Sequence, residues 1–132
     1  MLGKLKSLFK PADSLYARIG GKAALDVAVD IFYRKVLDDP CIRYFFEDVD
    51  MDMQRAKQKR FLSMVCGGPH KYTGKQIREA HAHLLPLGLN DEHFDHVVEH
   101  LKAALEECKV APPDLAEILQ AAEGFRTDVL GR

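Results

Sequence analysis

Apolar residues recur every three or four positions along each long segment of this chain, and this periodicity is the feature that most constrains the fold. Within residues 22–37, for example, Leu25, Val29 and Val36 fall on one face of a helix. Glycine pairs and prolines, such as the Gly-Gly pair at 20–21, separate one such segment from the next. No segment shows the strict alternation of apolar and polar residues that a half-buried strand requires. The sequence therefore predicts an all-α fold.

The breaks in this pattern set the expected bounds of the helices. Ser14 and Asn90 stand where side-chain oxygens cap two of them, and Pro69 follows the Gly-Gly pair that ends another. We expect helices at about 15–19, 22–37, 41–46, 51–66, 74–85, 91–108 and 112–130.

Residues 1–13 form a short basic amphipathic arm, which we separate from a single domain over residues 14–132. The arm carries three lysines and one acidic residue, with apolar residues at helical spacing before Pro11. A loosely docked tail is the simpler interpretation, and attachment to an anionic membrane surface or a partner is the alternative.

Length and charge exclude several classes of protein. A chain of 132 residues forms one domain and can bury a core without disulfides or structural metals. The 19 basic and 20 acidic residues leave a net charge of −1, which excludes a protein that coats nucleic acid. No apolar stretch reaches the roughly 18 residues of a membrane-spanning helix and no secretory signal is present, so we expect a cytoplasmic protein. The three cysteines lack C-x-x-C spacing and are expected to be reduced.

Two of the six histidines lie close together on an expected helix but face opposite sides. His81 stands one turn after Ile77 and one turn before Leu85, so it lies on the apolar face. His83 is rotated to the other side. A lone inward histidine is either a hydrogen-bonded core residue or a ligand.

Three further histidines lie three and four positions apart on a later expected helix: His93, His96 and His100. A divalent metal shared by two of them is one interpretation, because histidines four apart on a helix can bind one ion. A solvated helix flank is the other interpretation. We favour the flank, because no cysteine or carboxylate motif completes a ligand set.

Polar residues also lie on apolar faces of two other expected helices. Tyr33 shares the apolar face of its helix, where its hydroxyl needs a partner. The stripe along residues 51–66 begins with Gln54 and Gln58 and has Lys57 at its edge. A buried amide without a partner costs about 1–3 kcal/mol, so this end of the helix either protrudes into water or receives partners. An inward histidine opposite a tyrosine and two glutamines suits a flat apolar cofactor with a metal at its centre.

Four spaced segments carry a resemblance to a known family. They are LYARIGGKAALDVAVDIFYRKVLDDP, YFFEDVDMDMQRAKQKRFL, GGPHKYTGKQIREAHAHL and LNDEHFDHVVEHL, and together they resemble the truncated haemoglobins of group I. The resemblance covers about residues 14–130. It implies a truncated globin fold, a two-over-two helical sandwich around a haem.

The resemblance assigns roles to the residues that match. It makes His81 the proximal iron ligand and Tyr33 the distal hydroxyl that donates to a diatomic ligand, and hence the catalytic residue if the protein is an enzyme. Gln54 and Gln58 become supporting amides. It implies apolar contacts to the haem from Phe32, Phe46, Phe61, Leu62 and Ile77. It also implies contacts to the haem propionates from Tyr72, Lys75 and Arg78.

Two positions bear on how the haem is held. In some relatives the residue matching Lys57 binds the iron from the distal side, so Lys57 is either a sixth ligand or a lysine that extends to water or to a propionate. Some cyanobacterial relatives attach haem covalently through a histidine in the last helix. The matching position here is Phe125, so the expected cofactor is non-covalent haem b with its iron.

The resemblance leaves two classes of function open. One is the oxidation of nitric oxide by dioxygen, with a reductase as electron donor. The other is reversible binding of dioxygen by a carrier, store or sensor, without turnover. The expected small-molecule ligands are O₂, NO and CO, and the expected state is a monomer. A helical adaptor without haem is a further alternative, which the absence of a haem absorption band would establish.

Overall fold

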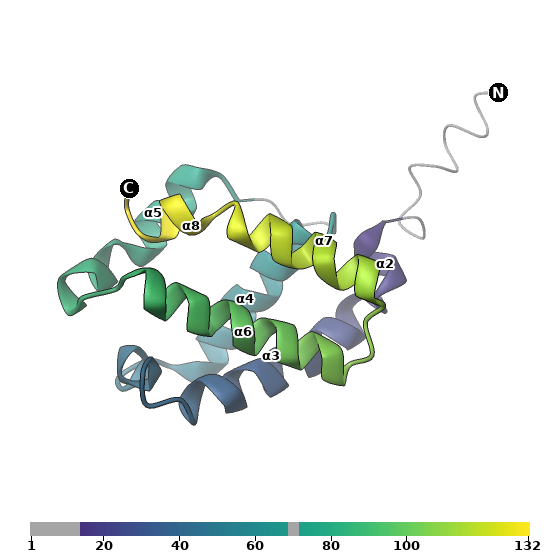
Figure 1. Ribbon diagram of the computed structural model, residues 1–132, viewed down its shortest axis with the longest axis horizontal. Coiled ribbons are helices and arrows are strands. Elements are labelled where there is room, and N and C mark those ends of the chain that lie inside the picture. Colours follow the sequence, from purple (N-terminus) through teal and green to yellow (C-terminus); the bar gives the residue numbers. More distant parts are fainter. Residues whose placement is uncertain (1–13, 69–71) are drawn as a thin grey trace.

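The computed structural model describes residues 14–68 and 72–132, and these residues form helices and turns without strands (Figure 1). The predicted all-α class is therefore confirmed. The N-terminal arm, together with Pro69 and His70, lies outside the described residues. The elements are α2 (Leu15–Arg18), α3 (Gly21–Leu37), the 3-10 helix η2 (Arg43–Phe46), α4 (Met51–Val65), α5 (Gly74–His81), the 3-10 helix η3 (Ala82–Leu87), α6 (Asp91–Glu107), α7 (Pro112–Glu123) and α8 (Arg126–Val129).

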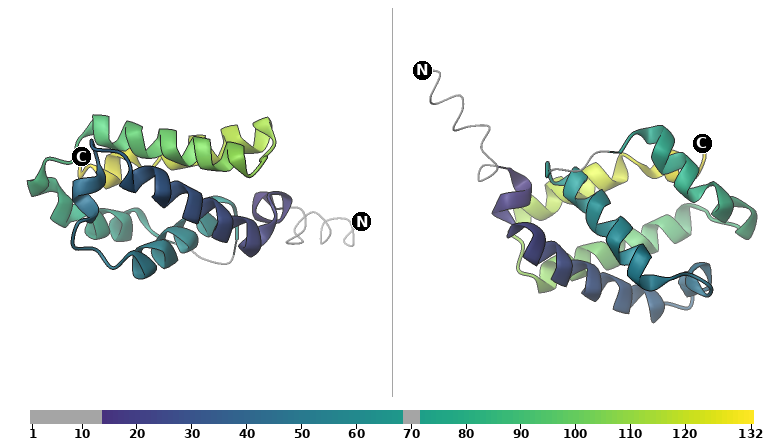
Figure 2. Two further views of the ribbon diagram at one scale, coloured as in Figure 1. Left: turned by 90° about the horizontal axis from the view of Figure 1, so that it is seen from below. Right: turned by 180° about the vertical axis from the view of Figure 1, so that it is seen from behind.

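Four of these helices form two stacked pairs. Helix α3 packs against both α4 and α6, and α7 packs against both α6 and α4. Figure 2 shows α6 lying over α3 when the molecule is seen from below. The expected two-over-two sandwich is thus present, with the short helices α5 and α8 packed together at one end of it. No helix within residues 14–68 and 72–132 is long and apolar enough to cross a bilayer.

The core lies between the two pairs, and the apolar face of α3 supplies much of it. Val29 and Val36 are fully buried on that face, and Leu25 is nearly so. Ala104 of α6 and Ile118 of α7 meet them as fully buried residues of the same apolar cluster. Burial of each valine, leucine or isoleucine side chain stabilises the fold by roughly 1.5–3 kcal/mol.

Side-chain caps start the helices where the sequence places them. The Ser14 hydroxyl accepts a hydrogen bond from the amide of Ala17, and the side chain of Asn90 accepts one from His93, so both predicted caps are confirmed. At the start of α5, Thr73 and Gln76 form a reciprocal capping box.

Gly68 permits a close approach between the end of α4 and α2. A Cβ atom at this position would overlap with Ser63 Oγ and would lie 2.9 Å from Tyr16 Cδ1. The preceding Gly67 has a φ of +77°, the left-handed conformation that favours glycine after a helix. The predicted end of this helix is confirmed, and glycine is needed there for both reasons.

Two predicted helices are interrupted in the structure. The helix expected over 74–85 is α-helical only to His81, and the 3-10 helix η3 then passes through Pro86, because proline clashes with the carbonyl four residues earlier in an α-helix. The helix expected over 112–130 breaks at Gly124, where the amide of Phe125 bonds to the carbonyl of Ala122 in a tighter turn.

Candidate functional site

His81 is the last residue of α5 and is held by its own helix. Its Nδ1 lies 2.8 Å from the carbonyl oxygen of Ile77, one turn earlier. Because a carbonyl only accepts, Nδ1 carries the proton and Nε2 keeps its lone pair. His81 is half-buried whereas His83 is exposed, which confirms the predicted difference between the two.

The surroundings of His81 keep its imidazole neutral. Burial lowers its pKa and outweighs the hydrogen bond to Ile77, which acts in the opposite direction. A neutral ring whose second nitrogen is fixed by a backbone carbonyl is the form in which histidine binds metals. The role of the Ile77 carbonyl is absent from the sequence prediction, although its position four residues before His81 could have indicated it.

Tyr33 lies in the interior of the molecule with a hydroxyl that can still donate. Its side chain is 1% exposed, and its oxygen accepts a 3.1 Å hydrogen bond from Gln54 Nε2. Burial raises the pKa of Tyr33 to about 12, so the phenol remains protonated at neutral pH. Since Gln54 is the donor in this pair, the phenolic proton is left for another acceptor.

The two glutamines predicted on the inner face of α4 and the lysine predicted at its edge differ from one another. Gln54 is half-buried and receives its partner from Tyr33, so the need for a partner that the sequence indicates is met. Gln58 is also half-buried, but its amide makes no hydrogen bond to any residue that the structure describes. Lys57 is exposed and forms no ion pair within the described part of the chain.

Several of the predicted apolar contacts are aromatic rings that pack edge-on in pairs. Phe32 and Phe46 contact the Tyr33 ring edge-on, at centroid distances of 4.8 Å and 5.9 Å. On α4, Phe61 packs edge-on against Phe125 at 5.3 Å. The remaining predicted apolar contacts, Leu62 and Ile77, are buried.

The three residues predicted to contact propionates all have partners within the protein. The hydroxyl of Tyr72 accepts from Arg60 Nε at 3.0 Å, and Lys75 forms a 4.0 Å ion pair with Glu79. Arg78 joins α5 to the C-terminus, because its guanidinium donates to Asp128 and to the carbonyl of Arg132. None of these bonds brings the three side chains together.

The donor set fits a haem. A neutral histidine with an available Nε2 suits the iron, and buried Phe, Leu and Ile side chains suit the flat apolar ring. The fit rests on two residues. His81 keeps a lone pair on Nε2, and Tyr33 keeps a hydroxyl proton that it can donate.

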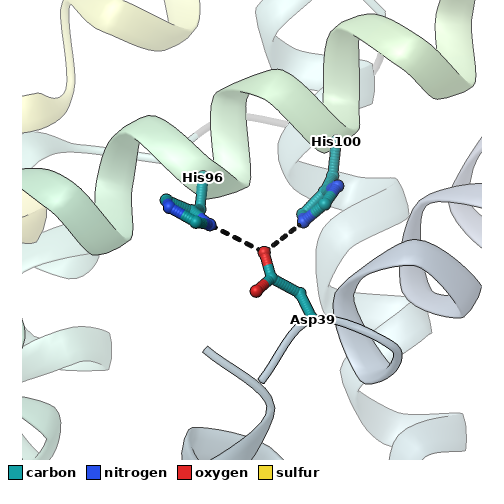
Figure 3. Close-up of side chains that lie close together, drawn as sticks. All are labelled: Asp39, His96 and His100. Carbon is teal, nitrogen blue, oxygen red and sulfur yellow. Dashed lines mark hydrogen bonds and ion pairs between the residues drawn. The ribbon is translucent and has the colours of Figure 1, made fainter. Parts of the chain in front are cut away.

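The histidines of α6 do not form the solvated flank that the sequence favours. His96 and His100 are half-buried, and both bond to the carboxylate of Asp39, which follows α3 (Figure 3). His93 completes the cap of α6 by accepting from the amide of Asn90. The flank interpretation is wrong for His96 and His100, because a carboxylate from a distant part of the chain reaches them.

Comparisons with known proteins identify relatives of the whole described domain. The model of the bacterial-like globin family matches residues 14–130. A group 1 truncated hemoglobin of Synechocystis sp. is 48% identical over 122 residues, which cover 90% of this chain and 98% of the relative. A group 1 truncated hemoglobin of Tetrahymena pyriformis is 40% identical over 119 residues, covering 90% and 96%.

Solved structures show the same fold. The 2/2 hemoglobin of Synechococcus sp., in the cyanomet state with covalently attached heme, superposes with a TM-score of 0.85 at 39% identity, covering 90% of this chain and 99% of that one. The Fe(III) form of the Tetrahymena pyriformis protein superposes with a TM-score of 0.80 at 39% identity, with the same coverage.

Proposed function

The chain belongs to the bacterial-like globin family, as a group 1 truncated haemoglobin, and from that premise we propose that it uses dioxygen to oxidise nitric oxide. Members of this family carry haem and bind diatomic gases. The proposed reaction combines O₂, NO and one electron to give nitrate, so a reductase must return the iron to the ferrous state after each turnover. Ferrous haem supplies the coordination site for dioxygen.

We assign the haem iron to His81. The bond from Nδ1 to the Ile77 carbonyl directs Nε2 away from the helix backbone, and the neutral state of the ring leaves that nitrogen able to coordinate. The hydrogen bond also fixes the orientation of the imidazole plane.

The buried Tyr33 hydroxyl is the observation that carries the proposal. It accepts from Gln54 and keeps its own proton for an acceptor in the distal space. A hydroxyl donor would slow the release of a diatomic ligand that carries partial negative charge. Slow release gives nitric oxide time to react, which serves an oxidising enzyme and hinders a carrier.

Rapid-mixing kinetics test this function. We expect slow O₂ release from the unmodified protein and fast conversion of its oxygenated form to the ferric form by nitric oxide, with one nitrate per haem. Tyr33→Phe should speed O₂ release by about tenfold to a hundredfold, because a hydrogen bond to a charged acceptor contributes about 1.5–3 kcal/mol. Fast O₂ release with slow oxidation of nitric oxide would support a carrier instead.

We propose that the haem is held without a covalent bond. Phe125 occupies the position that matches the covalently attached histidine of some relatives, and its ring packs against Phe61. Acid–acetone should therefore extract the haem completely. Haem retained by the protein after extraction contradicts this proposal.

Lys57 is the proposed sixth ligand of the ferric iron. It lies on α4 next to Gln58, and its exposed side chain must swing inward to reach the metal. A low-spin ferric spectrum that becomes high-spin in Lys57→Ala supports ligation. Lys59→Ala is the matched control on the same helix, since Lys59 pairs with Asp26. A high-spin spectrum in the unmodified protein from neutral to alkaline pH overturns the proposal.

A further inference from the structure

A carboxylate and two histidines converge at the surface between α6 and the turn that follows α3 (Figure 3). Oδ2 of Asp39 lies 2.8 Å from His96 Nδ1 and 2.6 Å from His100 Nε2. The two histidines are one turn apart on α6, so their rings project to the same side of the helix. None of the three belongs to the site assigned to the haem.

The carboxylate is oriented before any ion arrives. The backbone amide of Cys41 donates to Asp39 Oδ1 at 2.9 Å, which leaves Oδ2 turned toward the histidines. The Asp39 side chain is 10% exposed, and those of His96 and His100 are 33% and 22% exposed. The carboxylate is therefore largely shielded from solvent, whereas the two imidazoles remain partly accessible to small ions.

A second set of ligand atoms adjoins the first through His96. One ligand atom each of Cys41, Glu92 and His96 lies within 4.8 Å of the other two, as do those of Asp39, His96 and His100. Imidazole, carboxylate and thiolate are the groups that bind zinc in proteins. The neighbourhood of His96 thus offers further donor atoms beyond the first three.

We propose that Asp39, His96 and His100 form a binding site for one divalent transition-metal ion, with Zn²⁺ as the ion that fits best. Two ligands come from one helix at the four-residue spacing that allows a shared ion, and the third comes from another part of the chain. This set of three protein ligands with one open position is typical of tetrahedral zinc.

The present distances require a small rearrangement. Ligand atoms about 2.1 Å from a tetrahedral metal lie roughly 3.4 Å apart, so the two hydrogen bonds must lengthen by about 0.6–0.8 Å. We expect a small rotation of the Asp39 side chain, with Oδ1 still bonded to the Cys41 amide, to supply this movement. The protons that the histidines now donate to Asp39 leave as the ion enters, so binding releases protons.

The ion would join two parts of the fold that hydrogen bonds now connect. Asp39 lies between α3 and η2, and η2 carries Phe46, which contacts Tyr33. Zinc at this site fixes the start of η2 against α6. The site does not depend on the haem, so its failure and a failure of the proposed function are separate outcomes.

Zinc uptake by the full-length, untagged, haem-loaded protein tests the site. After removal of metals with EDTA, the protein is dialysed against ZnCl₂, and zinc and iron are measured separately by mass spectrometry. We expect one zinc per chain. Asp39→Asn, His96→Gln and His100→Gln should each bind zinc at least about tenfold more weakly. His93→Gln is the matched control and should bind like the unmodified protein, because glutamine preserves the capping box.

Zinc uptake by Asp39→Asn equal to that of the unmodified protein overturns the proposal, and so does the absence of uptake by the unmodified protein. A second measurement uses the unmodified protein, so it does not depend on whether the variants fold. In the diamagnetic ferrous protein saturated with CO, zinc should shift the ring NMR signals of His96 and His100 and leave those of His83 unchanged. Equal shifts of all histidine signals contradict a specific site.

Discussion

Two regions of this molecule use histidine in opposite ways. At the end of α5, a backbone carbonyl holds His81 and burial lowers its pKa, so the ring stays neutral with one nitrogen available. On α6, the carboxylate of Asp39 binds His96 and raises its pKa, so the protonated form of this ring is favoured. The difference teaches that burial favours the neutral form of one ring, whereas a carboxylate partner favours the protonated form of the other.

The largest expected effect comes from removing the imidazole of His81 at the end of α5. His81→Gly should abolish stable haem binding, because no other neutral imidazole replaces it at the end of α5. The absorption spectrum and the haem-to-protein ratio measure this, and added imidazole should restore the haem band. His83→Gly is the control and should retain haem. Haem bound equally by His81→Gly without imidazole would contradict the assignment.

Removing the negative charge of Asp39, beside the histidines of α6, should have a smaller effect. In metal-free protein, Asp39→Asn should lower the free energy of unfolding by about 1–3 kcal/mol, because the side chain loses its charged hydrogen bonds to two histidines. Urea unfolding measures this, with the haem spectrum unchanged. Asp38→Asn is the matched control, since Asp38 is exposed beside it. Equal destabilisation by both variants would show that the hydrogen bonds between Asp39 and the two histidines add nothing to the free energy of unfolding.

The two helices that carry these histidines begin with similar caps, and this permits a finer comparison. Thr73→Ala and Asn90→Ala should each lower the free energy of unfolding by about 1 kcal/mol. Because α5 spans eight residues and ends at His81, Thr73→Ala should also speed haem loss. Asn90→Ala should lower the unfolding temperature of the protein without that effect. Haem transfer to an apoglobin in excess distinguishes the two outcomes.

The smallest expected effect is a dependence of stability on pH. The raised pKa of His96 stabilises the folded protein below its ordinary value of 6.5, and this contribution is lost as the pH rises through the raised pKa. The pKa of Asp39 is lowered to about 2, because the hydrogen bonds from His96, His100 and Cys41 outweigh the opposing effect of burial. Its contribution is present above 3.8 and is lost as the pH falls toward 2.

The interaction between Asp39 and His96 therefore contributes most to the free energy of unfolding between about pH 3.8 and pH 6.5. In metal-free protein, His96→Gln should reduce the free energy of unfolding more at about pH 5.5 than at about pH 8.5. His93→Gln should show no such difference between the two pH values. Urea unfolding at both pH values measures the effect, and an equal loss at both would contradict the charge interaction.

The sequence predicts the parts of this molecule that local periodicity determines. The apolar stripe of α3 places Tyr33 inside, and the one-turn spacing from Ile77 distinguishes His81 from His83. The break after Cys66 follows from the conformational needs of glycine. Each of these depends on residues within a few positions of one another.

Contacts between distant residues are what the sequence does not predict. Asp39 and His100 are 61 positions apart, so no spacing indicates that they meet. The partner of Gln54 is 21 positions away, and the need for a partner is predictable although its identity is not.

The buried hydroxyl of Tyr33 has a consequence for a cell whose internal acidity varies. Its pKa of about 12 lies far above any pH at which such a cell lives. The phenol therefore keeps its proton over that whole range of pH, and with it the ability to donate to the ligand that we propose. A ligand that accepts a hydrogen bond from Tyr33, as we propose, would therefore meet the same donor under acid and under mildly alkaline stress.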